Sequence, residues 1–151
     1  MLYDAKFEIA DDATLVASTT TAWITTGKEI DWTAKGLDMG QGTPLYFNLS
    51  VGTTAYVGGT TCQFFLEVDD TSESHDGTGK RIMMTDELLV TDLTAGAYIY
   101  SGAVPVDVDA DRYLLLGITT DGATSSGTVN AWFSNAPMGS VSDTQVDESN
   151  I

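Results

Sequence analysis

Basic residues are scarce in this chain. Its 151 residues include 6 Lys and Arg against 22 Asp and Glu, which gives a formal net charge of −16 at pH 7. A charge of this sign and size repels nucleic-acid phosphates and anionic lipid surfaces. The sequence also has no run of 18 or more apolar residues that could cross a bilayer. We therefore expect neither a nucleic acid nor a membrane as a partner.

Cysteine and histidine are nearly absent as well. Cys62 is the only cysteine, which excludes an intrachain disulfide and a cysteine-based metal site, and we expect it to be a buried side chain in a strand. His75 is the only histidine, so a zinc site built on several histidines is excluded. No catalytic-triad, nucleophile-elbow or P-loop motif is found. We therefore expect no enzyme activity and no cofactor.

Helical periodicity is missing too, whereas alternation of apolar and polar residues is frequent. The segments 45–51, 61–68, 112–120 and 127–134 each place apolar side chains on one face, as expected of half-buried strands. Phe65 falls on the opposite face of its segment, which indicates a second covered surface. The predicted inward residues are Leu45, Phe47, Leu49, Val51, Cys62, Phe64, Leu66, Val68, Leu114, Leu116, Ile118, Val129, Ala131 and Phe133.

Several shorter segments are rich in Thr, Val, Ile and aromatic residues and are predicted to be further strands. The polar, Gly-rich stretch DGATSSG at 121–127 is predicted to be a hairpin loop that closes an antiparallel sheet. Eight or nine short strands without helices predict an all-β fold, an antiparallel jelly roll or two-sheet β-sandwich with long polar loops. The shorter strands are expected at Thr14–Ala17, Thr21–Thr25, Arg81–Thr85, Leu88–Thr91 and Tyr98–Ser101.

The length corresponds to a single domain, and no internal repeat or linker divides it. We expect an N-terminal arm over residues 1–12, one β-sandwich over 13–136, and a polar acidic tail over 137–151. The first residues do not combine a basic segment with an apolar one, so we do not expect a secretion signal.

Two groups of carboxylates are candidate cation sites. Asp107, Asp109 and Asp111 would share one face of an extended chain, where calcium could neutralise them, but Arg112 offers an internal counter-charge and an EF-hand pattern is absent. The loop from Asp69 to Lys80 is also acidic, and we expect it to be solvated. The three aspartates remain a weak candidate, and no metal site is predicted with a defined ligand set.

Trp23, Trp32 and Trp132, together with six Tyr, leave two interpretations open. They could form a stacking platform for sugars, as in β-sandwich binding modules, or they could pack in the core and at interfaces. The first interpretation requires a coplanar strip of exposed rings, and the second requires buried ones.

Several motifs together resemble a known family. DLTAGA at 92–97, the small-Pro pair near 103–105, RYLLL at 112–116 and TVNAWF at 128–133 are similar to segments of the jelly-roll capsid cement (decoration) proteins of tailed bacteriophages, in particular the Bordetella phage cement protein family. GTPLY at 42–46 and the opening MLYDAKFEIADDA are similar to the same family.

The resemblance implies a structural protein that binds the outside of a phage capsid and stabilises the junctions between capsomers. Its partners would be the major capsid protein and further copies of itself, as a dimer or trimer, and it would be made in the cytoplasm of the bacterial host. The alternative is a carbohydrate-binding or receptor-binding β-sandwich module. Apolar residues of the arm are the candidates for capsid or oligomer contact: Leu2, Tyr3, Phe7 and Ile9.

Overall fold

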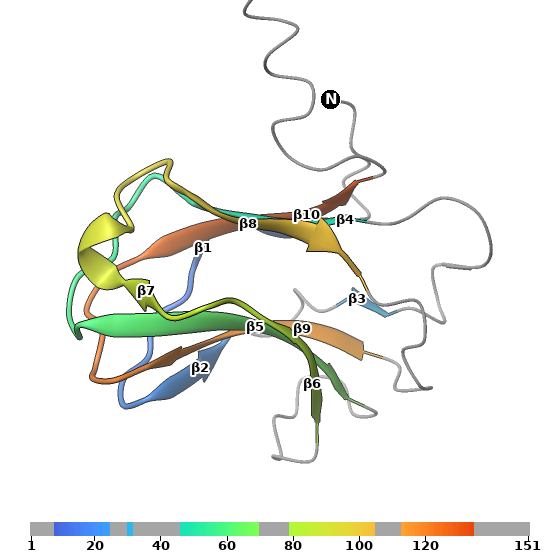
Figure 1. Ribbon diagram of the computed structural model, residues 1–151, viewed down its shortest axis with the longest axis horizontal. Coiled ribbons are helices and arrows are strands. Elements are labelled where there is room, and N and C mark those ends of the chain that lie inside the picture. The colour runs from blue at the N-terminus through green and yellow to red at the C-terminus, as the bar shows by residue number, and fades with distance from the viewer. Residues whose placement is uncertain (1–7, 25–29, 32–45, 70–78, 105–112, 135–151) are drawn as a thin grey trace, which may run out of the picture.

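Two antiparallel sheets make up the part of the protein that the structure describes. The computed structural model describes residues 8–24, 30–31, 46–69, 79–104 and 113–134. Sheet A has the strand order β1-β10-β4-β8, and the path of sheet B is β2-β9-β5-β6, with β3 added on β9 and β7 on β5. Figure 1 shows the two sheets as stacked layers. Sheet A contains β1 (Glu8–Thr14), β4 (Tyr46–Val51), β8 (Tyr98–Ala103) and β10 (Thr128–Ser134).

Sheet B contains the remaining strands, and all pairs in both sheets are antiparallel. A 3-10 turn, η2 (Val90–Asp92), directly follows β7. Within the described ranges no helix is long and apolar enough to span a membrane. The strands of sheet B are β2 (Thr21–Trp23), β3 (Ile30–Asp31), β5 (Thr61–Asp69), β6 (Lys80–Met84), β7 (Leu88–Leu89) and β9 (Tyr113–Thr120).

The order in which the chain visits the sheets is that of a jelly roll. It passes from β1 in sheet A to sheet B, returns to β4, crosses to β5, and later alternates again through β8, β9 and β10. Consecutive strands stay within one sheet only at β2 and β3 and at β5, β6 and β7, all of which belong to sheet B. This repeated crossing produces the two interleaved Greek keys of a jelly roll. The predicted all-β antiparallel jelly roll is therefore confirmed.

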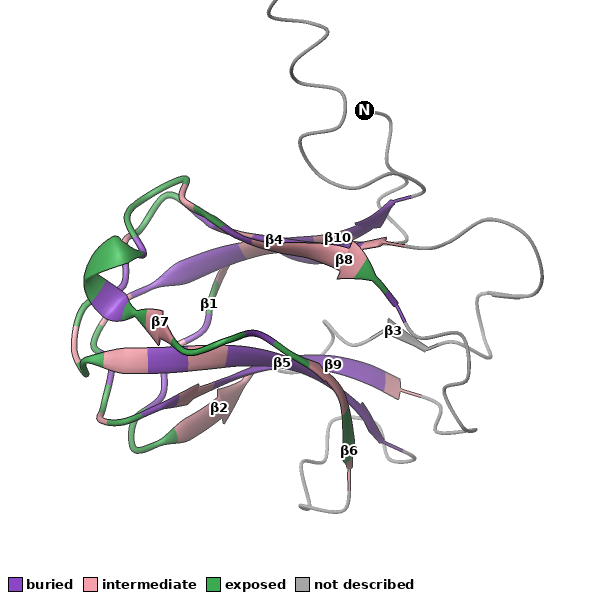
Figure 2. Ribbon diagram, viewed as in Figure 1, coloured by how far each residue is buried: buried purple, intermediate pink, exposed green. Residues whose placement is uncertain are grey.

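The core lies between the sheets and is built from the alternating faces of the longer strands. Phe47, Leu49 and Val51 of β4 face the core, and Leu114, Leu116 and Ile118 of β9 do so from the other sheet. Figure 2 shows the buried residues concentrated on β4, β5, β9 and β10. Every described residue predicted to face inward belongs to the core, including Cys62. The opposite faces are not fully exposed as half-buried strands require, because Asn48, Glu67 and Leu115 are buried too.

One predicted connection is wrong. Residues 121–127 do not form a hairpin loop, because β9 belongs to sheet B and β10 to sheet A, so the segment crosses between the sheets. Its turn-forming residues serve this crossing equally well, since turn chemistry favours a reversal without fixing which strands pair. Thr14–Ala17 is likewise not a separate strand; β1 ends at Thr14 and begins at Glu8, inside the range expected to form the arm.

Loops at one end of the sandwich are joined by hydrogen bonds. Gly52 N–H donates to the Thr128 carbonyl at 2.7 Å, and Val90 N–H donates to the Thr60 carbonyl at 2.9 Å. A single bridge pairs Val57 with Ser126. This end, drawn on the left in Figure 1 beside β7, is therefore a connected framework that fixes the starts of β5 and β10.

Candidate interaction surface

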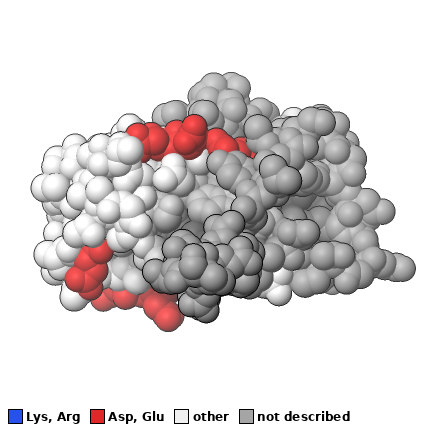
Figure 3. Space-filling model, turned by 90° about the horizontal axis from the view of Figure 1, so that it is seen from above, with Lys and Arg blue, Asp and Glu red and all other residues white. Residues whose placement is uncertain are grey.

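The described surface is dominated by negative charge. Lys80 and Arg81, both on β6, are the only basic residues in the described ranges. Acidic residues follow one another along β1 at Glu8, Asp11 and Asp12. In the view onto sheet A, the described acidic side chains lie in two groups at opposite sides of the molecule, with uncharged surface between them (Figure 3). A surface of this kind favours a basic partner.

Large apolar side chains are exposed along one edge of the sandwich. Tyr98, at the start of the edge strand β8, is 60% exposed, and Leu89, on β7, is 51% exposed. Met84 of β6 is also exposed on this edge, whereas exposed Val57 lies apart from it, in the connection between β4 and β5. Strands β8 and β6 are the last strands of their sheets, and Figure 1 draws both at the front. Exposed apolar groups beside open strand edges are typical of protein contact surfaces.

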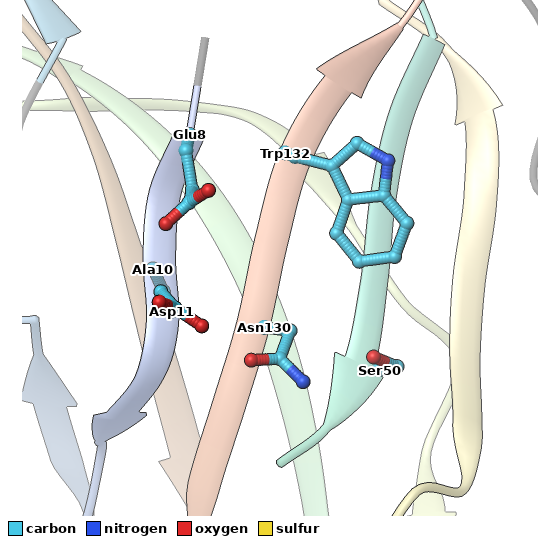
Figure 4. Close-up of a pocket in the computed structure, with 6 residues that line it drawn as sticks. All are labelled: Glu8, Ala10, Asp11, Ser50, Asn130 and Trp132. Carbon is cyan, nitrogen blue, oxygen red and sulfur yellow. The ribbon is translucent and has the colours of Figure 1, made fainter. Parts of the chain in front are cut away.

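A pocket lies on the outer face of sheet A. Its volume is about 250 Å³, and it is lined from three adjacent strands by Glu8, Ala10, Asp11, Ser50, Asn130 and Trp132. The register brings these residues together, because Glu8 is opposite Trp132 and Asn130 is opposite Ser50. Figure 4 shows the Trp132 ring extending from β10 toward β4, with the Glu8 and Asp11 carboxylates on the other side of β10.

A buried polar network strengthens the same sheet. Asn48 is fully buried, although its side chain is on the opposite face of β4 from Phe47 and Leu49. Its Nδ2 donates to Ser134 Oγ at 2.8 Å, and its Oδ1 accepts from Ser101 Oγ at 2.8 Å. These bonds between side chains link β4 to both of its neighbours, β10 and β8. The buried amide is therefore satisfied, as burial of a polar group requires.

Asp12 ties the end of β1 to the loop after β4 and to the first residue of β10. Its Oδ1 accepts from Thr53 N–H at 2.7 Å and from Thr128 Oγ1 at 2.6 Å, and its Oδ2 accepts from Thr53 Oγ1 at 2.6 Å. These donors hold the pKa of the Asp12 carboxyl below its ordinary value, with the Thr128 hydroxyl contributing most. Its backbone has a φ of 46°, and its N–H donates to Asn130 Oδ1 at 2.7 Å, so Asp12 also orients a residue of the pocket.

A second pocket, near Cys62, offers little chemistry. It has a volume of about 200 Å³, and Asp121 at its rim accepts hydrogen bonds from the backbone N–H groups of Thr60 and Thr61. These two bonds lower the pKa of the Asp121 carboxyl. Burial raises the pKa of the Cys62 thiol to about 11, so the nucleophilic thiolate is almost absent at neutral pH. The hydrogen bonds of Asp121 therefore hold the beginning of the crossing after β9 against the start of β5, and Cys62 is a core residue.

The outer face of sheet B carries the second covered surface that the sequence indicates. Phe65 is 1% exposed although it points away from the core. Trp23 packs against it edge to face, with ring centroids 6.1 Å apart, and the Arg81 guanidinium carbon lies 3.8 Å from its centroid. Arg81 Nε is also 3.9 Å from Glu67 Oε2. One of the two described basic residues is thus engaged within the fold.

Comparison with known protein families identifies the chain. The model of the Bbp16 family matches residues 12–133, which is most of the sequence and includes β10 up to Phe133. The chain belongs to the Bbp16 family. The name of that family suggests a protein of a Bordetella phage, in agreement with the resemblance found in the sequence. No curated protein matches the chain.

The Bbp16 match divides the pocket on sheet A. Ser50, Asn130 and Trp132 lie within the matched region, whereas Glu8, Ala10 and Asp11 precede it. The aromatic and amide side of the pocket is therefore part of the family domain. Its acidic side is supplied by the strand that leads into that domain.

Of the contact residues and the three candidate cation-site aspartates predicted from the sequence of this Bbp16-family protein, the structure describes only Ile9. Ile9 is 1% exposed and belongs to the core, so its side chain is not offered on the surface. Leu2, Tyr3 and Phe7 lie outside the described residues, as do Asp107, Asp109, Asp111, Arg112 and His75, and the tail at 137–151. Among the residues that are described, no cluster of His, Cys, Asp or Glu could hold a metal ion.

Sequence reasoning missed the pocket on sheet A. It named Trp132 only among the rings that could stack on a sugar or pack in the core and at interfaces, and it assigned Glu8 and Asp11 to the arm. The available signal was the pair of acidic residues in the first strand together with alternation in TVNAWFS, which puts Asn130 and Trp132 on one face. The pairing of β1 with β10 could not be read from either segment alone.

Proposed function

We propose that this Bbp16-family protein is a capsid cement protein. It binds the outside of a tailed-phage capsid and stabilises the junctions between capsomers through contacts with the major capsid protein. The role requires adhesion and no catalysis. The observation that carries the proposal is the family match over residues 12–133, combined with the sequence motifs that resemble cement proteins.

The surface supports this proposal. A cement protein needs a rigid body with an outer surface suited to another protein, and the connected loops at one end provide rigidity. Exposed Tyr98, Leu89 and Met84 supply apolar contact area along one edge. The excess of carboxylates supplies attraction to a basic capsid surface.

Self-association is part of the proposal. Many weak contacts add to high avidity when a symmetric oligomer binds a symmetric shell. The open edge formed by β8 and by β6 with β7 is the described surface best suited to contact a second copy, because strand edges and exposed apolar residues coincide there. A dimer or trimer would present two or three capsid-binding surfaces at once.

A carbohydrate-binding or receptor-binding module is the second candidate, and the Trp132 pocket is the observation that favours it. Sugar-binding modules of this kind need several rings in one plane. The described tryptophans do not provide this, because Trp132 is on the outer face of sheet A and Trp23 packs beside Phe65 on sheet B. The cement role therefore has the stronger support.

The test is reattachment to capsids that lack the protein. Capsids of the phage that encodes this chain, assembled without it, are mixed with the purified protein and pelleted. We expect the protein to pellet with capsids in a saturable ratio and to raise the temperature at which the shells rupture. A variant lacking residues 2–7 keeps Ile9 in the core and tests the arm. We expect that variant to fold normally and to bind capsids more weakly.

The cement proposal fails if the full protein remains in the supernatant at all concentrations while a capsid-binding control pellets. It also fails if the protein binds capsids only through sugars, so that a glycan competitor releases it completely.

A further inference from the structure

The pocket on sheet A has the size of a single side chain. At about 250 Å³ it falls below the range of about 300–1,000 Å³ typical of pockets for small-molecule ligands. It is closed on one side by the indole of Trp132 and on the other by the carboxylates of Glu8 and Asp11, as Figure 4 shows. A long, flat side chain from a neighbouring protein would fill such a space.

The hydrogen-bonding groups of the pocket are mainly acceptors. Glu8 and Asp11 contribute four carboxylate oxygens, and Ser50 contributes a hydroxyl. The one amide, Asn130, already uses its oxygen to accept from Asp12 N–H. A sugar presents donors and acceptors in similar number, whereas a guanidinium presents donors only. The acceptor excess therefore selects a cation over a carbohydrate.

The two carboxylates have no cation beside them among the described residues. The basic residues of the described ranges, Lys80 and Arg81, lie on β6, which pairs with β5 in the other sheet. Arg81 is engaged by Phe65 and Glu67 there. Within the described ranges Glu8 and Asp11 are thus a negative pair without a neighbouring cation, on the other side of β10 from the ring of Trp132. A planar cation can stack on the ring while it bonds to both carboxylates.

We infer that this pocket binds an arginine side chain of the protein partner, with the guanidinium over Trp132 and its N–H groups donating to Glu8 and Asp11. Arginine is favoured over lysine because its planar fork suits both the indole face and two carboxylates. That the pocket binds arginine is inferred from its own residues. That the arginine belongs to a basic patch of the capsid shell rests on the proposed function. The net charge of −16 disfavours competing anionic partners.

The first experiment uses small probes and nuclear magnetic resonance. The ¹⁵N-labelled protein is titrated with N-acetyl-arginine methylamide and with its neutral isostere N-acetyl-citrulline methylamide. We expect the arginine probe to shift the Trp132 indole and Asn130 amide signals saturably, with at least fivefold tighter binding than the citrulline probe. Added salt should weaken the binding of the arginine probe only.

Matched variants separate the pocket from the overall charge. The double variant E8Q/D11N removes two negative charges at the pocket, and D86N/E87Q removes two exposed ones near β7. We expect E8Q/D11N to weaken arginine binding at least fivefold and D86N/E87Q to change it less than twofold. W132L should also lose binding, with a well-dispersed spectrum showing that it folds. Equal weakening by both double variants, equal binding of citrulline, or saturable shifts with methyl glycosides instead would overturn the inference.

Capsid binding then separates this inference from the proposed function. We expect E8Q/D11N to bind capsids at least tenfold more weakly than D86N/E87Q. If the wild-type protein binds capsids and E8Q/D11N binds them equally well, the pocket is not the contact and the inference fails while the cement role stands. If the arginine probe saturates the pocket but the protein never binds capsids, the cement role fails and the pocket assignment stands.

Discussion

Gly117 and Phe65 provide a sharp test of the packing on the outer face of sheet B. They are directly opposite each other on β9 and β5, and the phenyl ring lies over the glycine. A Cβ added to Gly117 would overlap the ring at Cζ and lie 2.9 Å from Cε1. The ring has little room to retreat, because Trp23 and Arg81 pack against it. This is the cross-strand arrangement in which an aromatic ring covers a glycine.

The expected magnitudes follow from this geometry. Overpacking by one methyl group costs about 1–3 kcal/mol. Replacing glycine by alanine also reduces the conformational freedom of the unfolded chain, which offsets about 0.4–1 kcal/mol of that cost. G117A should therefore lower the free energy of unfolding by about 1–2 kcal/mol. F65A should lower it by about 3–5 kcal/mol, since the ring is 1% exposed. In the F65A background the clash is gone, and G117A should be neutral or slightly stabilising.

The assay is urea unfolding of the wild type, the two single variants and the double variant, followed by tryptophan fluorescence. We expect a coupling free energy of about 1–3 kcal/mol, and for G117A alone a Tm lowered by roughly 2–8 °C. If F65A does not fold, F65L shortens the ring while it retains part of the packing. Additive effects, with G117A equally destabilising in both backgrounds, would refute the account of this face.

Three further outcomes are expected. D12N should lower the Tm at pH 7, because an amide is a poorer acceptor than a carboxylate for the three hydrogen bonds of Asp12. The difference in Tm between D12N and wild type should shrink as the pH falls through the ordinary carboxyl pKa of 3.8 and below, because the stabilising effect of a lowered pKa is lost on protonation. A Tm difference that is unchanged at pH 2.5 would contradict this. Cys62, with its pKa raised to about 11, should resist a thiol reagent at pH 8 until urea unfolds the protein, and rapid modification of the native protein would show that the site opens. Sedimentation across a sodium chloride series tests the proposed oligomer, which should become tighter as salt screens the repulsion between subunits of charge −16. Protein bound to the proposed capsid partner should instead be released as ion pairs weaken. An oligomer that is insensitive to salt but dissociates on chelation would indicate a specific cation site in place of screening.

The sequence predicted the faces of individual strands well. Alternation is a local property, and burial on one face follows from it directly, as Leu49, Leu66 and Leu116 show. The boundaries of β1 were harder to predict, because Asp11 and Asp12 interrupt the alternation where the register with β10 shifts. A bulge of this kind has no simple sequence pattern.

Pairing between distant strands could not be predicted. The loop at 121–127 has the composition of a hairpin, yet it crosses between sheets, because the partners of β10 are β1 and β4 instead of β9. The Trp132 pocket depends on the same fact, since Glu8 reaches Trp132 only through the pairing of β1 with β10. Local residue patterns carry no information about which distant segment will lie alongside.

Direct imaging of the virion tests the central claim most directly. Cryo-electron microscopy of the phage that encodes this chain should show jelly-roll density on the outer surface of the shell, at the junctions between capsomers, into which the two sheets fit in the order β1-β10-β4-β8 and β2-β9-β5-β6. Shells whose outer surface carries no such density, from virions in which mass spectrometry also fails to detect the protein, would contradict the cement role.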